Sequence, residues 1–178
     1  MTNIKHVLIL ITILATSIGF SQNDDKMTKT DQEWKNSLTE MSYQVLRNSY
    51  TERPFTGEYN LHFEKGSYNC KGCNQKLFES NDKYESNCGW PSFDQAIPDR
   101  ITYVKDYSLN MNRIEVKCSK CDGHLGHVFN DGPQPTGLRY CMNYESMYFL
   151  DPTSTKKNKK KILTFMYLIN HLKMKIAQ

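Results

Sequence analysis

The sequence predicts a mainly β domain that has short helices at its N-terminal end and a structural four-cysteine zinc site. Residues 55–149 are rich in tyrosine, phenylalanine and β-branched residues, which glycine, proline, asparagine and aspartate interrupt repeatedly, as in short strands joined by turns. Residues 31–48 carry apolar side chains at helical spacing instead. Four of the six cysteines form two Cys-x-x-Cys pairs, which is the spacing of zinc knuckles.

The chain begins with the pattern of a secretory signal peptide, which we place at residues 1–21. Lys5 and His6 precede an apolar run at residues 7–18, and small residues that fit a cleavage site follow it. This run is too short to cross a bilayer core of about 30 Å comfortably. We therefore expect an exported protein, periplasmic or secreted, and an uncleaved N-terminal membrane anchor is the alternative.

A polar linker at residues 22–30 is expected to lead into the helical segment at residues 31–48. Apolar side chains recur in that segment at steps of three and four: Trp34, Leu38, Met41 and Val45. This spacing predicts one or two short amphipathic helices. Further along, residues 101–104 and 113–116 alternate as strands do. We place a single domain at residues 31–150, which is long enough to bury one core.

The two Cys-x-x-Cys pairs are Cys70 with Cys73 and Cys118 with Cys121. The short turn within each pair lets both sulfurs face one side of a tetrahedral ion, so the two pairs predict one site for a single zinc ion. Four thiolates leave no open position for water, which favours a structural ion over a catalytic one. The alternative is a thioredoxin-like redox pair, but that motif usually occurs once and near a strand–helix–strand pattern.

The remaining thiols, Cys88 and Cys141, are candidates for chemistry. A thiol reacts as its thiolate, and a cation such as Arg139 stabilises that form, so we expect Cys141 to be the nucleophile. His124 and His127 follow the second cysteine pair closely. An imidazole exchanges a proton near neutral pH and suits a general acid that works with a thiolate. The alternatives for these histidines are a further zinc ligand or an ordinary turn residue.

The basic charge of the chain lies in a C-terminal extension at residues 151–178. This extension has seven lysines and one acidic residue, whereas the whole chain carries only +4, so residues 1–150 are slightly acidic. We interpret the extension as unstructured or as a surface helix, and contact with an anionic membrane is the alternative. Because the domain itself is not basic, we expect no nucleic-acid partner.

Two other classes of protein remain open from the residues alone. A zinc-ribbon binding module would use the knuckles to shape a docking surface, and it predicts a basic or aromatic face on the domain. A small exported disulfide protein would pair its six cysteines into three bridges. Counting free thiols after denaturation in a zinc chelator separates the second class from a zinc protein.

Four separated motifs between about residues 33 and 150 resemble the methionine sulfoxide reductase B family and occur in that family's order. They are Thr-Glu-Arg-Pro-Phe-Thr-Gly-Glu-Tyr at 51–59, Cys-Gly-Trp-Pro-Ser-Phe at 88–93, His-Leu-Gly-His-Val-Phe at 124–129 and Gly-Leu-Arg-Tyr-Cys at 137–141 followed by Asn143. The resemblance implies a mostly antiparallel, tent-like β fold stapled by zinc. It also implies reduction of the R epimer of methionine sulfoxide, mainly within oxidised proteins.

By position, the resemblance makes Cys141 the catalytic cysteine and Cys88 the resolving cysteine. Trp90 matches the aromatic wall that receives the S-methyl group of the substrate. The family's polar shell is matched by His124, His127, Arg139 and Asn143. Alternatives for single residues are an ordinary buried turn at Trp90, a carboxylate partner such as Glu145 for Arg139, and a structural disulfide between Cys88 and Cys141.

The residue types suit this chemistry. An indole face accepts an apolar methyl group, and a proton from a histidine on the sulfoxide oxygen makes the sulfur electrophilic. We expect His127 to supply that proton, with His124 in support. Attack by Cys141 would leave a sulfenic acid, Cys88 would condense with it to a disulfide, and a thioredoxin-like protein would reduce that disulfide. We expect no flavin or nicotinamide cofactor.

Overall fold

The computed structural model describes residues 26–153. Two helices open this part of the chain, α2 (Asp31–Ser37) and α3 (Glu40–Asn48), and they confirm the predicted short helices. The strands are β1 (Ser67–Cys70), β2 (Lys76–Glu79), β3 (Lys83–Tyr84), β4 (Ser92–Phe93), β5 (Ile101–Asp106), β6 (Arg113–Cys118), β7 (His124–Phe129), β8 (Arg139–Met142) and β9 (Met147–Leu150). Short 3-10 helices lie between some of them: η1 (Ser80–Asp82), η2 (Ser108–Asn110) and η3 (Tyr144–Ser146). The predicted signal peptide and most of the predicted C-terminal extension lie outside the described residues.

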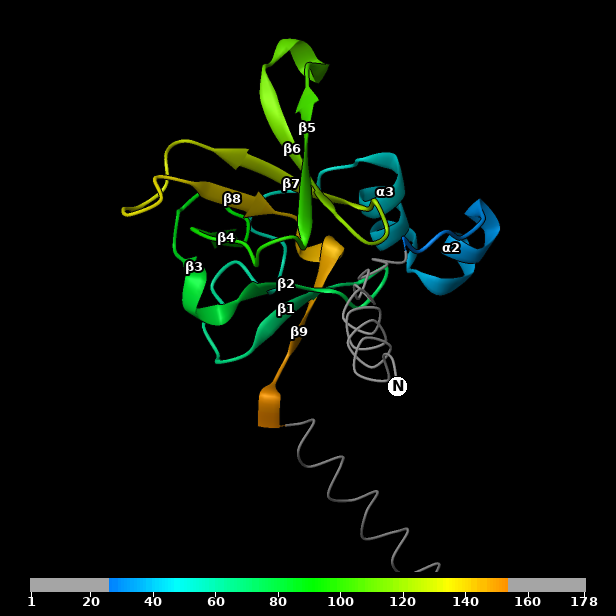
Figure 1. The fold of residues 1–178 in the computed structure, drawn as a ribbon, viewed down its shortest axis with the longest axis horizontal. Helices are drawn as coiled ribbons and strands as arrows, with labels where there is room; N and C mark the ends of the chain where they lie inside the picture. The colour runs from blue at the N-terminus through cyan, green and yellow to red at the C-terminus, as the bar shows by residue number, and fades with distance from the viewer. Residues whose placement is uncertain (1–25, 154–178) are drawn as a thin grey trace, which may run out of the picture.

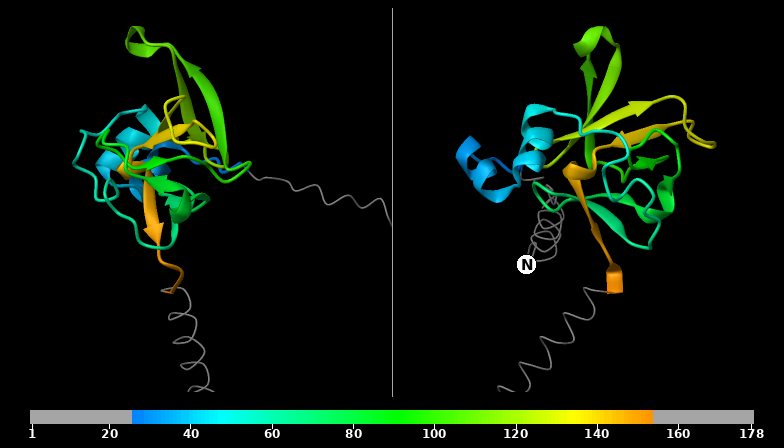
Figure 2. Two further views of the ribbon diagram at one scale, coloured as in Figure 1. Left: turned by 90° about the vertical axis from the view of Figure 1, so that its left-hand side faces the viewer. Right: turned by 180° about the vertical axis from the view of Figure 1, so that it is seen from behind.

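The strands form two antiparallel sheets, which confirms the mainly β fold class. The smaller sheet has the order β2-β1-β9, and the larger sheet has the order β3-β4-β8-β7-β6-β5. Every strand pair in both sheets is antiparallel. The smaller sheet lies below the larger one in Figure 1, and the hairpin of β5 and β6 projects away from both (Figures 1 and 2).

The strands predicted at residues 101–104 and 113–116 are confirmed as the first parts of β5 and β6. Most of β5 is exposed, so the alternation of its side chains does not mark a buried face. In the pairing of β5 with β6, Asp106 at the end of β5 lies opposite Arg113 at the start of β6. These two charged side chains are therefore neighbours at the turn end of the hairpin.

Aromatic side chains fill the space between the two sheets. Tyr68 and Phe78 come from the smaller sheet and Phe93 from the larger sheet, and all three are fully buried. The rings of Phe78 and Phe93 stack with their centroids 4.3 Å apart, and Tyr68 meets Phe93 edge-on at 5.0 Å. Burial of one such side chain stabilises the fold by about 1.5 to 3 kcal/mol. The cluster thus holds the sheets together and fixes β4 beside β8.

Capping residues account for the positions of the helices. Thr30 starts α2 through a capping box with Glu33, and Thr39 starts α3 by accepting a hydrogen bond from the backbone N–H of Ser42. Helix α3 ends at Ser49, which adopts a left-handed conformation with φ of 54°. The two helices bury Trp34, Tyr43, Val45 and Leu46. Helix α3 packs against η3 and against β7, which is the strand that carries both candidate histidines.

The end of the predicted linker also contacts the domain. The backbone N–H of Met27 donates to the carbonyl oxygen of Lys120 at 2.7 Å, and the Met27 side chain packs on the core. This hydrogen bond joins the chain before α2 to the second cysteine pair. Within residues 26–153, no helix has both the length and the apolar character needed to cross a membrane.

Candidate active site

Strand register brings reactive side chains into one row across the larger sheet. Glu115 in β6 lies opposite His127 in β7, His127 lies opposite Cys141 in β8, and Cys141 lies opposite Ser92 in β4. Directly opposed residues of antiparallel strands have their side chains on the same face of the sheet. A thiol and an imidazole that are separated by a long loop in the sequence are therefore neighbours in the fold.

A cavity of about 110 Å³ lies on this face of the sheet. Its lining includes Trp90, Arg113, His127, Phe129, Cys141 and Asn143. Four of the predicted site residues thus share one cavity, namely the Cys141 thiol, the His127 imidazole, the Trp90 indole and the Asn143 amide. The other three predicted residues, Cys88, His124 and Arg139, lie around the cavity without lining it.

Cys88 lies beside Cys141, although the two are far apart in the sequence. Their Sγ atoms are 3.5 Å apart, and both are free thiols that are partly buried. The loop before β4 makes this approach possible, because Gly89 has a φ of 90° and a side chain there would lie 2.7 Å from Cβ of Pro54. A disulfide requires sulfurs about 2.05 Å apart, so a small movement of either side chain closes the bond.

The two thiols ionise as a coupled pair. The hydrogen bond with Cys141, followed by the hydroxyl groups of Ser86 and Ser92, lowers the pKa of Cys88 to about 4. The same contact with Cys88, together with burial, raises the pKa of Cys141, and the nearby charge of Arg139 only partly opposes this. Two sulfurs this close share one proton, and the resting charge lies on Cys88. The sequence argument from Arg139 predicted a lowered pKa for Cys141, which is the opposite direction.

Arg139 is held by a carboxylate, but its partner is Asp131 and not Glu145. Its Nε and Nη2 atoms donate to the two carboxylate oxygens of Asp131, both at 2.8 Å. Glu145 accepts from Lys71 instead, at 2.7 Å. The guanidinium group also lies over the ring of Phe129, 4.4 Å from its centroid. Arg139 therefore supports one wall of the cavity, and Asp131 neutralises much of its charge.

His127 is oriented by Asp106, the last residue of β5 before the turn of the β5–β6 hairpin. Its Nε2 atom lies 2.7 Å from Oδ2 of Asp106, and because an ionised carboxylate can only accept, Nε2 carries the donated proton. Arg113 donates to the same oxygen at 2.7 Å. Burial lowers the pKa of His127, and the contact with Asp106 works against that effect. A second proton on this ring would therefore occupy Nδ1.

His124 lies behind His127 and is almost completely buried. Its Nδ1 atom is 2.6 Å from Oε1 of Glu115, and its ring centroid is 5.5 Å from that of His127. Its Nε2 atom has no hydrogen-bond partner among the described residues. His124 does not line the cavity, so it cannot contact a molecule bound there. Its ring contact with His127 suits a role in holding that imidazole in place.

Glu52 links the indole wall to the polar side of the cavity. Its carbonyl oxygen accepts from Nε1 of Trp90 at 3.1 Å, and its backbone N–H donates to Oδ1 of Asn143 at 3.2 Å. The Glu52 carboxylate is buried and accepts the backbone N–H groups of Tyr144 and Glu145 at 2.6 and 2.9 Å. One residue thus fixes the chain on both sides of the cavity.

Four residues of this arrangement were missed in the sequence: Glu52, Asp106, Arg113 and Glu115. Glu52 lies inside one of the four family-like motifs, so an acid in that motif was an available signal. The other three belong to β5 and β6, where charged residues at strand ends are ordinary surface features. Only the strand register shows that they reach the two histidines.

The four remaining cysteines form a separate cluster that is positioned for a metal ion, as predicted. Their sulfur atoms all lie within 4.8 Å of one another, and two of the pairs, Cys70 with Cys121 and Cys73 with Cys118, are 3.5 Å apart. A tetrahedral ion with Zn–S bonds of about 2.3 Å places its sulfurs about 3.8 Å apart, so the cluster fits. Gln75 donates to the Cys118 sulfur at 3.5 Å, which favours a thiolate. Neither candidate histidine belongs to the cluster.

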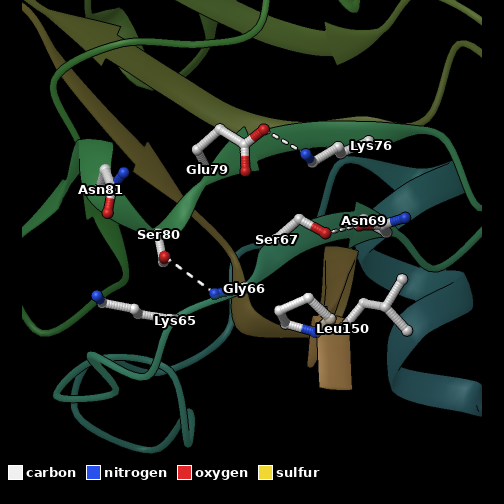
Figure 3. A pocket seen from close by; sticks show the side chains of 10 residues that line it. Lys65, Gly66, Ser67, Asn69, Lys76, Glu79, Ser80, Asn81 and Leu150 are labelled. Carbon is white, nitrogen blue, oxygen red and sulfur yellow. Dashed lines mark hydrogen bonds and ion pairs between the residues drawn. The ribbon is translucent and has the colours of Figure 1, made fainter. Parts of the chain in front are cut away.

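A larger cavity of about 480 Å³ lies between β1, β2 and the end of β9. Figure 3 shows the ion pair of Lys76 with Glu79 on one side of it, and the backbone N–H of Gly66 donating to Oγ of Ser80 at 3.0 Å. Neither a thiol nor an imidazole lines this cavity. The reactive groups are gathered at the smaller cavity beside Cys141.

Fold and site together define a β domain with a cysteine cluster that is suited to a structural metal and, apart from it, a thiol pair that is suited to redox chemistry. A family described as "SelR domain" matches residues 38–151. Curated relatives named "Peptide methionine sulfoxide reductase MsrB" are similar over most of their length. The relative from Bradyrhizobium diazoefficiens is 53% identical over 67% of this chain and 87% of its own.

Two further relatives with the same name give the same result. The one from Hahella chejuensis is 55% identical over 70% of this chain and 91% of its own. The one from Methanosarcina mazei is 50% identical over 76% of this chain and 98% of its own. The chain belongs to the MsrB family.

Proposed function

We propose that this protein reduces the R epimer of methionine sulfoxide, mainly within oxidised proteins, to methionine. Membership of the MsrB family supports the reaction. The observation that carries the proposal is the pair of Cys141 and Cys88, whose sulfurs are 3.5 Å apart, with Cys141 in a cavity shared with an imidazole and an indole. The choice of the R epimer comes from the family resemblance.

The cavity offers opposite environments for the two ends of the sulfoxide. The indole of Trp90 provides an apolar face for the S-methyl group, and its N–H is already used by the Glu52 carbonyl oxygen. The sulfoxide oxygen is then directed to the side of His127 and Asn143. Hydrogen bonds or a proton on that oxygen draw electron density from the sulfur and prepare it for attack.

Cys141 is the nucleophile because of where it lies. It lines the cavity, whereas Cys88 does not. Its raised pKa means that its proton must leave before the attack, and the Cys88 thiolate 3.5 Å away is the nearest acceptor. The Cys141 thiolate then attacks the sulfoxide sulfur, and His127 gives a proton to the oxygen. The protonated oxygen moves to Sγ of Cys141 as its bond to the substrate sulfur and the transient bond between the two sulfurs break. Methionine leaves, and Cys141 becomes a sulfenic acid.

Cys88 resolves this intermediate. Its sulfur bonds to Sγ of Cys141, the S–OH bond breaks, and the hydroxyl group leaves as water with the proton of Cys88. The disulfide is then reduced by a dithiol protein of the thioredoxin type, which becomes oxidised itself. We also propose, from the N-terminal pattern, that the protein is exported. Outside the reducing cytoplasm that donor must obtain electrons from elsewhere. Detection of the full-length chain, with its first residues intact, in the cytoplasmic fraction would overturn the proposed export.

We further propose that the cysteine cluster holds one structural zinc ion through Cys70, Cys73, Cys118 and Cys121. The ion would clamp the turn after β1 to the turn between β6 and β7. Four thiolate ligands leave no position for a reactant. The zinc therefore stabilises the fold and takes no part in the redox steps.

Reduction of each methionine sulfoxide epimer with dithiothreitol tests the function. Wild type should reduce the R epimer, and Cys141→Ser should reduce neither. Cys88→Ser should release one methionine per chain, accumulate a sulfenic acid and lose recycling by thioredoxin. Turnover by Cys141→Ser at the wild-type rate, or a preference for the S epimer, would refute the assignment.

A further inference from the structure

Two serine hydroxyl groups surround the sulfur of Cys88. Oγ of Ser86 lies 3.0 Å from Sγ of Cys88, and Oγ of Ser92 lies 3.4 Å from it. The two hydroxyl oxygens are 2.7 Å apart, so they are hydrogen-bonded to each other as well. Ser92 is fully buried in β4, directly opposite Cys141. The cluster is thus a fixed part of the sheet and its preceding loop.

The protons in this cluster can be counted for each state of Cys88. As a thiol, Cys88 can donate to the carbonyl oxygen of Trp90, 3.6 Å away. As a thiolate it can only accept, and Ser86 is oriented to donate to it while Ser92 donates to Ser86 or to the sulfur itself. The Ser92 hydroxyl group can also donate to the Trp90 carbonyl oxygen, 3.2 Å away. When it donates to Ser86 instead, that hydrogen bond polarises the Ser86 hydroxyl group, which donates to the ionised sulfur.

Cys141 has no such environment. Its sulfur is hydrogen-bonded to Cys88, and the cation beside it, Arg139, is bound on two atoms by Asp131. No hydroxyl group donates to the Cys141 sulfur in the described residues. The two thiols therefore have different surroundings. Among the described residues, serine hydroxyl groups contact the sulfur of Cys88 and not that of Cys141, whose own charged neighbour is Arg139.

We propose that Ser86 and Ser92 are positioning residues that hold the negative charge on Cys88 and so prepare it to attack the sulfenic acid on Cys141. The inference rests on the proposed function for the identity of that sulfenic acid. Its first consequence, a stabilised thiolate on Cys88, can be measured without any substrate. The serines keep their own protons in this step, so the hydroxyl group of the sulfenic acid still leaves as water with the proton of Cys88.

Other charged groups also face Cys88, and they must be kept constant in the test. Lys83 and Tyr84 come from β3, and Arg139 and Cys141 come from β8. Burial opposes ionisation of the Cys88 thiol, so the hydrogen bonds must outweigh it. Replacing either serine with alanine changes none of these charges. A change in the ionisation of Cys88 then reports the lost hydroxyl groups.

The test uses the full chain with Cys141→Ala, which removes the coupled thiol. The rate of alkylation of Cys88 by iodoacetamide is followed against pH, with peptide mass spectrometry to read Cys88 alone. Ser86→Ala should raise the apparent pKa of Cys88 by about one unit, since a hydrogen bond to a charged group has that strength. Ser86→Ala with Ser92→Ala should raise it further. Ser86→Thr should restore the lower value.

Ser80→Ala, which removes a hydroxyl group at the larger cavity, is the matched control and should leave the alkylation profile unchanged. Zinc content checks that each variant is folded. An apparent pKa that the double serine variant leaves unchanged would overturn the proposal. So would an equal rise in Ser86→Thr, which would show that packing and not the hydroxyl group matters.

A second measurement separates this inference from the proposed function. In protein with both cysteines, the double serine variant should still yield one methionine per chain in a single turnover, but it should close the disulfide more slowly at neutral pH. If wild type forms no methionine while the serine variants still shift the Cys88 profile, the function is wrong and the inference stands. If methionine forms and the disulfide closes at the wild-type rate in the double variant, the inference is wrong.

Discussion

Substitution of Asp106 by asparagine tests whether His127 is the proton donor. The carboxylate lies 2.7 Å from Nε2 of His127, and the two side chains are only 18% and 11% exposed. An asparagine has the same shape and can still accept the backbone N–H of Ser108, which now binds Oδ1 of Asp106 at 2.8 Å. It carries no charge, however, and it can turn an N–H group toward Nε2.

The expected size of the effect follows from that contact. A hydrogen bond between charged groups contributes about 1.5 to 3 kcal/mol. Arg113 shares the same carboxylate oxygen and solvent screens part of the charge, so we take the lower end. About 1.4 kcal/mol corresponds to one pKa unit. Burial already lowers the pKa of His127 and Asp106 opposes this, so Asp106→Asn should lower that pKa by about one further unit.

The direction of the pH effect depends on which protonation state of His127 takes part in the proposed reaction. The protonated imidazole is the donor, so activity falls as the pH rises through the pKa of His127. In Asp106→Asn that fall should begin about one pH unit lower, and the rate at neutral pH should drop about tenfold. The assay is single-turnover formation of methionine by a Cys88→Ser protein, which isolates the first step.

Glu115→Gln provides the comparison, because it removes the carboxylate beside His124, which has no surface in the cavity. Its profile should stay close to that of the parent protein. An unchanged pH profile in Asp106→Asn would refute the role given to His127. An equal shift in both variants would show that the contact of His127 with Asp106 has no special role.

Two further outcomes follow from the cavity wall and the cysteine cluster. Trp90→Ala should lower kcat/KM at least about fivefold, since an aromatic contact of this kind contributes about 1 kcal/mol beyond its burial. Trp90→Phe should keep most of the activity. Equal loss in both would mean that the indole N–H bond to Glu52 matters more than the apolar face. Removal of metal by a chelator under reducing conditions should lower the Tm and make four additional thiols reactive to a thiol reagent. Cys88 and Cys141 should react before chelation. No change in the number of reactive thiols on chelation would exclude the zinc site.

The sequence predicted the parts of this protein that depend on local pattern. The helices at α2 and α3 follow from apolar spacing and threonine caps, and the cysteine cluster follows from two short turns that can each be recognised alone. The family-like motifs predicted that Cys141, His127, Trp90 and Asn143 belong to one site, and all four line the cavity. These features are visible because each is encoded within a few consecutive residues.

Contacts that depend on strand register could not be predicted. Asp106 reaches His127 only because β5 and β7 both pair with β6, and nothing in the sequence near Asp106 indicates an imidazole. The partner of Arg139 was open for the same reason. Asp131 is its partner because the loop between β7 and β8 returns the chain to the start of β8. A neighbour in the sequence is a poor guide to a neighbour in a sheet.

The ionisation of Cys141 also depends on a contact that the sequence does not show. Arg139 is two residues away in the sequence, but Cys88 is in contact through space, and the contact decides where the resting charge lies. In the proposed reaction that charge does not make Cys88 the nucleophile, because Cys141 lines the cavity and Cys88 does not. In the proposed reaction it makes Cys88 the base that accepts the proton of Cys141, and the serine hydroxyl groups favour release of that proton when the disulfide forms. Position in the cavity selects the attacking sulfur, and the hydrogen bonds around its partner select which sulfur carries the charge between steps.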